Sequence, residues 1–163
     1  MIIVVRNHIH LIGEIDDRLA VEFDNKFELA LSFPSKSIHL HLSSPATEKI
    51  LVKIQLSYKP VYVNIHNASV YYQYTGVASA ASLIASYASK KIIDYNATFM
   101  IHHARQIIKD QNDVLYWAEK TGLDYDIVDH LIKSEKVMDA SCAKDFGFVD
   151  DINYNLYSLP LTA

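Results

Sequence analysis

The sequence is poor in several features that mark particular classes of protein. It has one cysteine, Cys142, so it cannot form an internal disulfide bond. No apolar run reaches membrane-spanning length, and the first residues, Met1 to Arg6, lack a signal peptide's basic start and small-residue cleavage site. The net charge is −4 without a basic cluster, which gives no electrostatic basis for binding nucleic acid. We therefore expect a cytoplasmic protein that binds neither membranes nor nucleic acid.

What the sequence does contain is enough apolar material for one core. Half of its 163 residues are hydrophobic and 21% are charged, which predicts a single globular domain over residues 1–163. Strand patterns alternate with helix patterns along the chain. Strands are expected at residues 2–5, 8–12, 37–42 and 61–66, and helices after Asp16 or Asp17 and over residues 47–59, 113–120 and 124–133. This pattern predicts an α/β fold.

Two histidines, His39 and His41, lie on the same side of the strand expected at residues 37–42. Histidines two residues apart on a strand can bind a metal ion. The sequence places no carboxylate or cysteine near them at ligand spacing. We therefore expect no metal site, and we interpret His66, at the end of the next strand, as structural.

The most informative stretch runs from Thr75 to His103. It begins with Gly76 and a run of small residues, which allow a sharp turn into a tightly packed helix. Ser79 is the serine best placed at that turn to act as a nucleophile, because nearby backbone amides would stabilise the oxyanion formed by its attack. An apolar β-type run at residues 98–101 then delivers His102, and a histidine at a strand end can reach a neighbouring helix start.

These residues resemble a known family. The block Ala78-Ser79-Ala80-Ala81-Ser82-Leu83-Ile84-Ala85, followed by Met100-Ile101-His102, is similar to the serine and histidine blocks of the Clp protease proteolytic subunit, and most similar to the Clp-like proteases of phage and bacterial genomes. Their separation matches without a gap. Aligning Gly76 with the family's glycine would instead put Ala80 at the nucleophile position. Segments 11–17, 118–123 and 138–150 also resemble this family, whereas residues 67–75 look like an insertion.

The resemblance implies a Clp/crotonase-like fold, with repeated β-β-α units and a core sheet flanked by helices. It implies Ser79 as the nucleophile, His102 as the base and Glu135 as the acid, with Asp139 as the fallback. It also implies an oxyanion hole formed by the backbone amides of Ala80 and Ala46. The family's glycine pair at the latter turn is replaced here by Ala46-Thr47, where a positive φ would cost on the order of 1 kcal/mol.

The implied function is that of a serine endopeptidase that hydrolyses peptides or unfolded proteins through an acyl-enzyme, without a cofactor. The resemblance also implies a homo-oligomer and an ATPase chaperone partner, although the segment between His102 and Glu135 is short for a double ring. Two alternatives stay open. One is a weak or inactive Clp-like subunit with an oligomeric or regulatory role, and the other is a crotonase-type acyl-CoA enzyme, which the Met100-Ile101-His102 block disfavours.

Overall fold

The computed structural model describes residues 1–68, 75–102 and 113–155. Its larger sheet has six strands in the order β1-β2-β3-β4-β6-β9. All neighbouring pairs are parallel except β1 with β2, which form an antiparallel hairpin. The strands are β1 (Ile2–Val5), β2 (His8–Ile12), β3 (Ile38–Ser43), β4 (Val61–Ile65), β6 (Lys90–Asp94) and β9 (Asp151–Asn153). The first four strands lie where their alternation predicts them.

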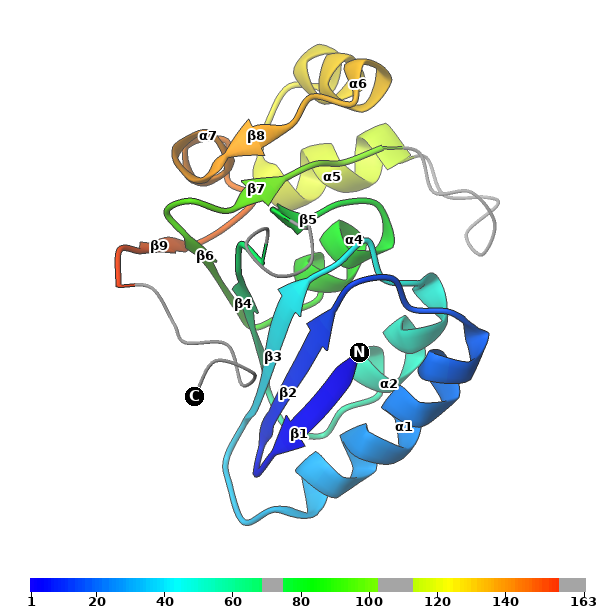
Figure 1. Ribbon diagram of the computed structural model, residues 1–163. Coiled ribbons are helices and arrows are strands. Elements are labelled where there is room, and N and C mark those ends of the chain that lie inside the picture. Colours follow the sequence, from blue (N-terminus) through cyan, green and yellow to red (C-terminus); the bar gives the residue numbers. More distant parts are fainter. Residues whose placement is uncertain (69–74, 103–112, 156–163) are drawn as a thin grey trace.

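One face of this sheet is covered by helix α1 (Asp17–Ser32) (Figure 1). The Asp16 side chain caps this helix by accepting a hydrogen bond from the Leu19 N–H, at 2.8 Å. Phe23 and Phe27 point inward and pack with the apolar residues that alternate along the strands. The apolar residues of the sheet on this side are almost fully buried: Ile9, Leu11, Leu40, Leu42, Val63, Ile65 and Ile93.

The helix expected at residues 47–59 is shorter than predicted. A 3-10 turn, η1 (Glu48–Ile50), leads into α2 (Leu51–Gln55), and the helix stops there. Local bonds replace the next helical turn, since Ser57 Oγ donates to Lys59 O at 2.7 Å. Tyr58 was expected on the inward face of this helix but is 76% exposed.

A second sheet of three short strands stands beside the end of the first. Its order is β5 (Gly76–Val77), β7 (Thr98–Phe99) and β8 (Met138–Asp139). Four helices accompany it: α4 (Ala80–Ser86), α5 (Asp113–Thr121), α6 (Tyr125–Ser134) and α7 (Ala140–Asp145). In Figure 1 helices α5, α6 and α7 lie beyond this small sheet, on the side away from α1. The predicted helices at residues 113–120 and 124–133 are confirmed as α5 and α6, but Leu115, expected inward, is 57% exposed and Trp117 is buried instead.

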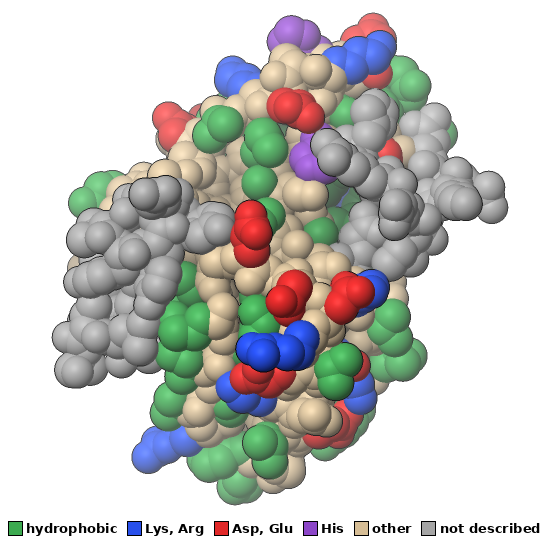
Figure 2. All heavy atoms as spheres, turned by 45° about the vertical axis from the view of Figure 1, so that its right-hand side comes forward, with side chains coloured by type: hydrophobic (Ala, Val, Ile, Leu, Met, Phe, Trp, Pro, Cys, Tyr) green, Lys and Arg blue, Asp and Glu red, His purple; other side chains and the backbone are tan. Residues whose placement is uncertain are grey.

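Charged side chains of both signs lie interspersed on the face shown in Figure 2. Some of them pair between elements, as in the contact of Lys49 with Asp17 at 2.7 Å and of Lys53 with Glu28 at 2.8 Å. Such exposed pairs contribute little to stability. Within the described ranges, no helix has both the length and the apolar character needed to cross a bilayer.

Candidate active site

The small sheet brings three predicted site segments to one of its ends. β5 and β7 are parallel, with Val77 beside Phe99, and β8 is antiparallel to β7, with Met138 opposite Phe99. The chain therefore leaves β5 and β7, and enters β8, at the same end of the sheet. Ser79 lies two residues beyond β5, and Glu135 lies three residues before β8.

His102 follows β7 at the same end and is half-buried. Two contacts hold its segment against that of Ser79. The Met100 N–H donates to Val77 O at 3.1 Å, which extends the β5–β7 pairing by one bond. Ser82 Oγ donates to Met100 O from the first turn of α4. The backbone thus places the predicted nucleophile and base on adjoining segments.

Ser79 has an unusual backbone. It lies between β5 and α4 as the N-cap of the helix, with φ 58° and ψ −128°. A non-glycine residue in such a conformation costs on the order of 1–3 kcal/mol, and residues of this kind gather at functional sites. The described residues include only three others that are not glycine and have positive φ: Arg6, Ala46 and Glu135. Three of these four strained residues are therefore ones that the resemblance assigns to the site.

The two predicted oxyanion donors differ in their surroundings. Ala80 is the first residue of α4, and within the described part of the chain its N–H has no acceptor. The Ala46 N–H instead donates to Ser44 Oγ at 2.7 Å, and Ser44 Oγ donates in turn to Gly13 O at 2.5 Å. To bind an oxyanion, the Ala46 amide would have to exchange this acceptor for it.

Substitution of Ala46 by glycine is expected to stabilise the protein by up to about 1 kcal/mol, because Ala46 has φ 51°. Urea unfolding of Ala46→Gly against wild type measures the change. The matched control is Ala78→Gly, since Ala78 is not among the positive-φ residues and its replacement should destabilise the protein. A decrease in stability for Ala46→Gly would contradict the strain at this turn.

The two candidate acids have different tasks in the structure. Asp139 caps α7, because its carboxylate accepts a hydrogen bond from the Cys142 N–H at 2.8 Å. Glu135 is exposed at the end of α6 in the left-handed conformation, with φ 48° and ψ 42°. Glu135 thus lies in a strained turn before β8, at the end of the small sheet that Ser79 and His102 follow, whereas the Asp139 carboxylate is already engaged in capping α7.

Replacing each acid in turn by its amide distinguishes their roles. Glu135→Gln is expected to lower kcat roughly 10³- to 10⁴-fold if it orients His102, as loss of the acid does in serine proteases. Asp139→Asn should change kcat less than tenfold, since asparagine also caps helices well. Peptide hydrolysis by the two variants measures this, and the reverse order of losses would make Asp139 the acid.

A cavity of about 280 Å³ is lined in part by Ala78, the residue before Ser79. Its walls come from both ends of the small sheet and from the turn after β3. They are mostly apolar and comprise Ser44, Pro45, Thr75, Gly76, Val77, Ala78, Thr98, Met100 and Val137. Such a cavity is suited to hold an apolar side chain of a bound molecule.

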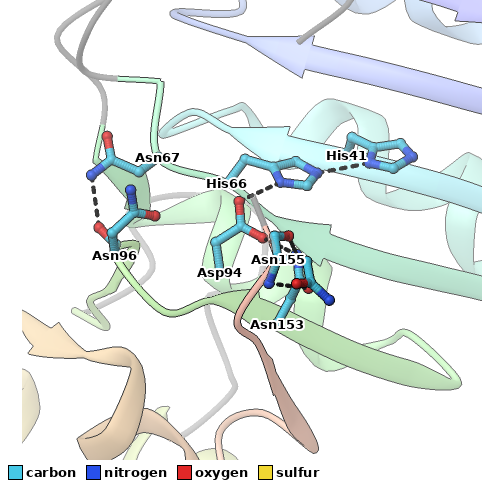
Figure 3. Close-up of polar contacts among 7 residues, drawn as sticks. All are labelled: His41, His66, Asn67, Asp94, Asn96, Asn153 and Asn155. Carbon is cyan, nitrogen blue, oxygen red and sulfur yellow. Dashed lines mark hydrogen bonds and ion pairs between the residues drawn. The ribbon is translucent and has the colours of Figure 1, made fainter. Parts of the chain in front are cut away.

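A further cluster of polar side chains, which the sequence did not reveal, lies on the sheet face away from α1. His66, interpreted as structural, has its Nδ1 2.7 Å from Asp94 Oδ2 and its Nε2 2.8 Å from His41 Nδ1 (Figure 3). The alternation in residues 37–42 placed His39 and His41 on one face. The partners come from β4 and β6, and only the register of the parallel strands brings them together.

Burial disfavours a charge on His8, His10, His39 and His41. It lowers the pKa of His10 to about 4 and that of His41 to about 2, and neighbouring imidazoles lower both pKa values further. The pKa values of His8 and His39 are also lowered, mainly by burial.

The free energy of unfolding is expected to fall as pH decreases below about 6.5. The unfolded chain takes up protons at these histidines near their ordinary pKa of 6.5, while the folded chain does not until lower pH. His41 alone then lowers stability by about 1.4 kcal/mol for each pH unit. Urea unfolding between pH 7.5 and pH 5 measures the slope, and His130→Gln, at an exposed position on α6, is the control that should keep it. A stability that does not change with pH would contradict the burial of these groups.

Comparison with known proteins bears on the fold. No protein-family model and no curated protein matches the sequence. Among solved structures, ClpP1 from Listeria monocytogenes matches with a TM-score of 0.71 and 23% sequence identity over 93% of each chain. A point mutant of the same protein matches with a TM-score of 0.67 and 21% identity over 92% of each chain.

The chain therefore has the Clp protease-like fold, a mixed α/β architecture with a central sheet flanked by helices. The fold class expected from the resemblance is confirmed.

Proposed function

We propose that the protein is a serine peptidase of the Clp type. The observation that carries the proposal is the position of Ser79. It lies in a strained strand-to-helix turn beside the segment that carries His102, and the residue before it, Ala78, lines an apolar cavity. The comparison supports it through the fold, since peptidases of this type share this architecture.

The proposed reaction is acyl transfer to water. His102 takes the hydroxyl proton of Ser79 as the Ser79 oxygen attacks the peptide carbonyl. The carbonyl carbon then carries an oxyanion, which the Ala80 N–H stabilises. The Ala46 N–H adds to this if it leaves Ser44 Oγ. His102 gives its proton to the leaving amine, and Glu135 holds the imidazole in the required orientation. His102 then takes a proton from water as the water oxygen attacks the acyl carbon, and it returns this proton to the Ser79 oxygen as the ester bond breaks.

The proposed substrate is a peptide or an unfolded protein with an apolar side chain beside the cleaved bond. The cavity next to Ala78 and Ser79 supports this, because its walls are largely apolar. We further propose a homo-oligomer that works with an ATPase chaperone in the cytoplasm, which rests on the fold and on the resemblance.

One observation favours a second candidate, a weak or inactive subunit of the same fold. The Ala46 N–H is engaged by Ser44 Oγ, so one of the two expected oxyanion donors is occupied. Loss of one such donor typically lowers turnover roughly 10²- to 10³-fold. Slow hydrolysis is therefore compatible with the peptidase proposal, whereas complete lack of reaction at Ser79 favours the second candidate.

Labelling with a fluorophosphonate tests the proposal, because this reagent reacts with activated serines. We expect modification of Ser79, located by peptide mass spectrometry, that is abolished in Ser79→Ala and slowed in His102→Ala. Ser89→Ala, an exposed serine outside the site, is the control that should label like wild type. Folded wild-type protein that does not react would refute the peptidase proposal.

A further inference from the structure

Histidines form a continuous ladder on the sheet face away from α1. His8 stacks on His39 with ring centroids 4.6 Å apart, and His10 stacks on His41 at 4.2 Å. The ring of His41 stacks in turn on that of His66, the residue after β4, with centroids 5.0 Å apart. His8 and His39 are register partners on β2 and β3, as are His10 and His41, whereas His41 pairs with Asn64 of β4.

Within this ladder, four groups are joined by hydrogen bonds into one chain. His8 Nδ1 lies 2.9 Å from His41 Nε2. His41 Nδ1 lies 2.8 Å from His66 Nε2, and His66 Nδ1 lies 2.7 Å from Asp94 Oδ2 (Figure 3). His41, His66 and Asp94 are buried, with exposed fractions of 7%, 3% and 4%. His8 is half-buried at the outer end. The chain therefore runs from near the surface to a buried carboxylate, and we call it the histidine relay.

The carboxylate fixes the direction of every bond in the histidine relay. An ionised carboxylate only accepts, so His66 Nδ1 must carry a proton and donate it. A neutral His66 then accepts at Nε2 from His41 Nδ1, and a neutral His41 accepts at Nε2 from His8 Nδ1. All three imidazoles are thus assigned the Nδ1–H tautomer, which leaves the acceptor nitrogen of the relay at His8 Nε2.

The surroundings disfavour a charge on His41, in the middle of the relay. Burial lowers the pKa of His41 to about 2, and the imidazoles of His10, His66, His8 and His39 disfavour a charge there further. On the same face β1 contributes the apolar Ile3 and Val5, and β4 contributes Tyr62. The charged residues on it, Lys90 of β6 and Asp151 of β9, are both exposed. Within the described ranges no three His, Cys, Asp or Glu side chains converge so as to hold a metal ion.

A proton can reach Asp94 along this path with every bond accounted for. It binds His8 Nε2 from water, and the Nδ1 proton of His8 moves to His41 Nε2. The Nδ1 proton of His41 moves to His66 Nε2, and that of His66 moves to Asp94 Oδ2. One proton is taken up in total. The relay ends as three Nε2–H imidazoles and a neutral carboxylic acid.

Asp94 stands where the chain passes from the large sheet to the small one. Its other oxygen, Oδ1, accepts from Asn153 Nδ2 at 2.9 Å, and Tyr95 N–H donates to Asn153 O at 2.9 Å. The next residues lead into β7 and then to His102. Asn67, which follows His66, also contacts the segment between β6 and β7, since its Nδ2 donates to Asn96 O at 2.7 Å.

We propose that the histidine relay lets solvent protons neutralise Asp94, and that His66 and Asp94 are thereby pH-dependent positioning residues for His102. Neutralisation replaces the charge-assisted bond from Asn153 with a weaker one, which loosens the start of the segment that carries His102. Activity then falls at acidic pH through the relay. The link to activity rests on the proposed peptidase function, whereas the relay does not.

Nitrogen-15 NMR of histidine-labelled wild-type protein tests the relay without any activity. Long-range nitrogen–proton correlations at pH 7.5 should show Nδ1–H tautomers for His8, His41 and His66, with the exposed His130 as the internal reference. On acidification His41 and His66 should change to Nε2–H together. Nε2–H tautomers at pH 7.5, or independent titration of the two rings, would overturn the proposal.

Peptide hydrolysis against pH tests the positioning role. The acidic limb of kcat/KM should fall with one proton fewer in Asp94→Asn than in wild type, because asparagine removes the group that the relay protonates. His130→Gln should keep the wild-type limb. The same limb in wild type and Asp94→Asn would overturn the positioning role. If wild type has no activity while the tautomers are as expected, the peptidase proposal fails and the relay stands.

Discussion

Replacement of Ser79 by alanine is expected to lower kcat for an apolar fluorogenic peptide roughly 10⁴- to 10⁶-fold. The proposed reaction begins with attack by the Ser79 oxygen, and alanine at that position has no atom that can form the acyl-enzyme. Any activity left would come from binding and from the Ala80 N–H alone. Initial rates over a range of peptide concentrations measure the loss.

The fold should not share in this loss. Ser79 is only half-buried, and its side chain makes no capping bond to α4, so its truncation removes little packing. We expect the unfolding free energy of Ser79→Ala to lie within about 1 kcal/mol of wild type. Hydrolysis by Ser79→Ala within tenfold of wild type would mean that another group is the nucleophile.

Replacement of Gly76 by alanine is expected to destabilise the protein by more than about 3 kcal/mol. A Cβ atom at Gly76 would lie 1.9 Å from Thr98 O, 2.6 Å from Thr98 N and 2.7 Å from Thr98 C. All three are backbone atoms of the strand paired with β5, so neither side can yield without separating the pair. Activity should be lost as well, because this pairing places the segments of Ser79 and His102 side by side. Urea unfolding and peptide hydrolysis measure both effects.

The matched control for that substitution is Gly122→Ala. Gly122 ends α5 with φ +75°, and no atom lies within 4 Å of a Cβ built there. Alanine should cost about 1 kcal/mol from the backbone angle alone and leave activity unchanged. Equal losses at the two glycines would show that close approach of β5 and β7 is not what requires Gly76.

The part of the fold that could be predicted from sequence is the part set by local patterning. Short β-type runs predicted β1 and β2, alternation of apolar residues predicted β3 and β4, and Asp16 was one of the two residues expected to cap α1. The helix predicted for residues 47–59 was too long, because the pattern continued past the point where Ser57 bonds to Lys59 O. Residues 69–74, most of the tyrosine-rich insertion, lie outside the described residues.

At the site, the sequence predicted which segments matter, and the structure adds the backbone geometry. The small residues after Gly76 predicted a tight helix entry at Ser79, but not that Ala46 and Glu135 would share its positive φ. The acceptor that Ser44 provides for the Ala46 amide could not be foreseen, since a hydroxyl rotates to whatever partner the fold offers. The contact of Asp94 with His66 could not be foreseen either, because the two residues are 28 positions apart and come together only through the pairing of β4 with β6.

The positive φ at Ser79 makes thermal stability and catalytic activity favour different residues at this position. Glycine adopts φ 58° without steric cost, so a variant library screened only for survival at high temperature should be enriched in Ser79→Gly. These variants would be more stable than wild type but unable to form an acyl-enzyme. Serine at this position therefore lowers the free energy of unfolding, and a screen for hydrolysis would select against the stabilising glycine.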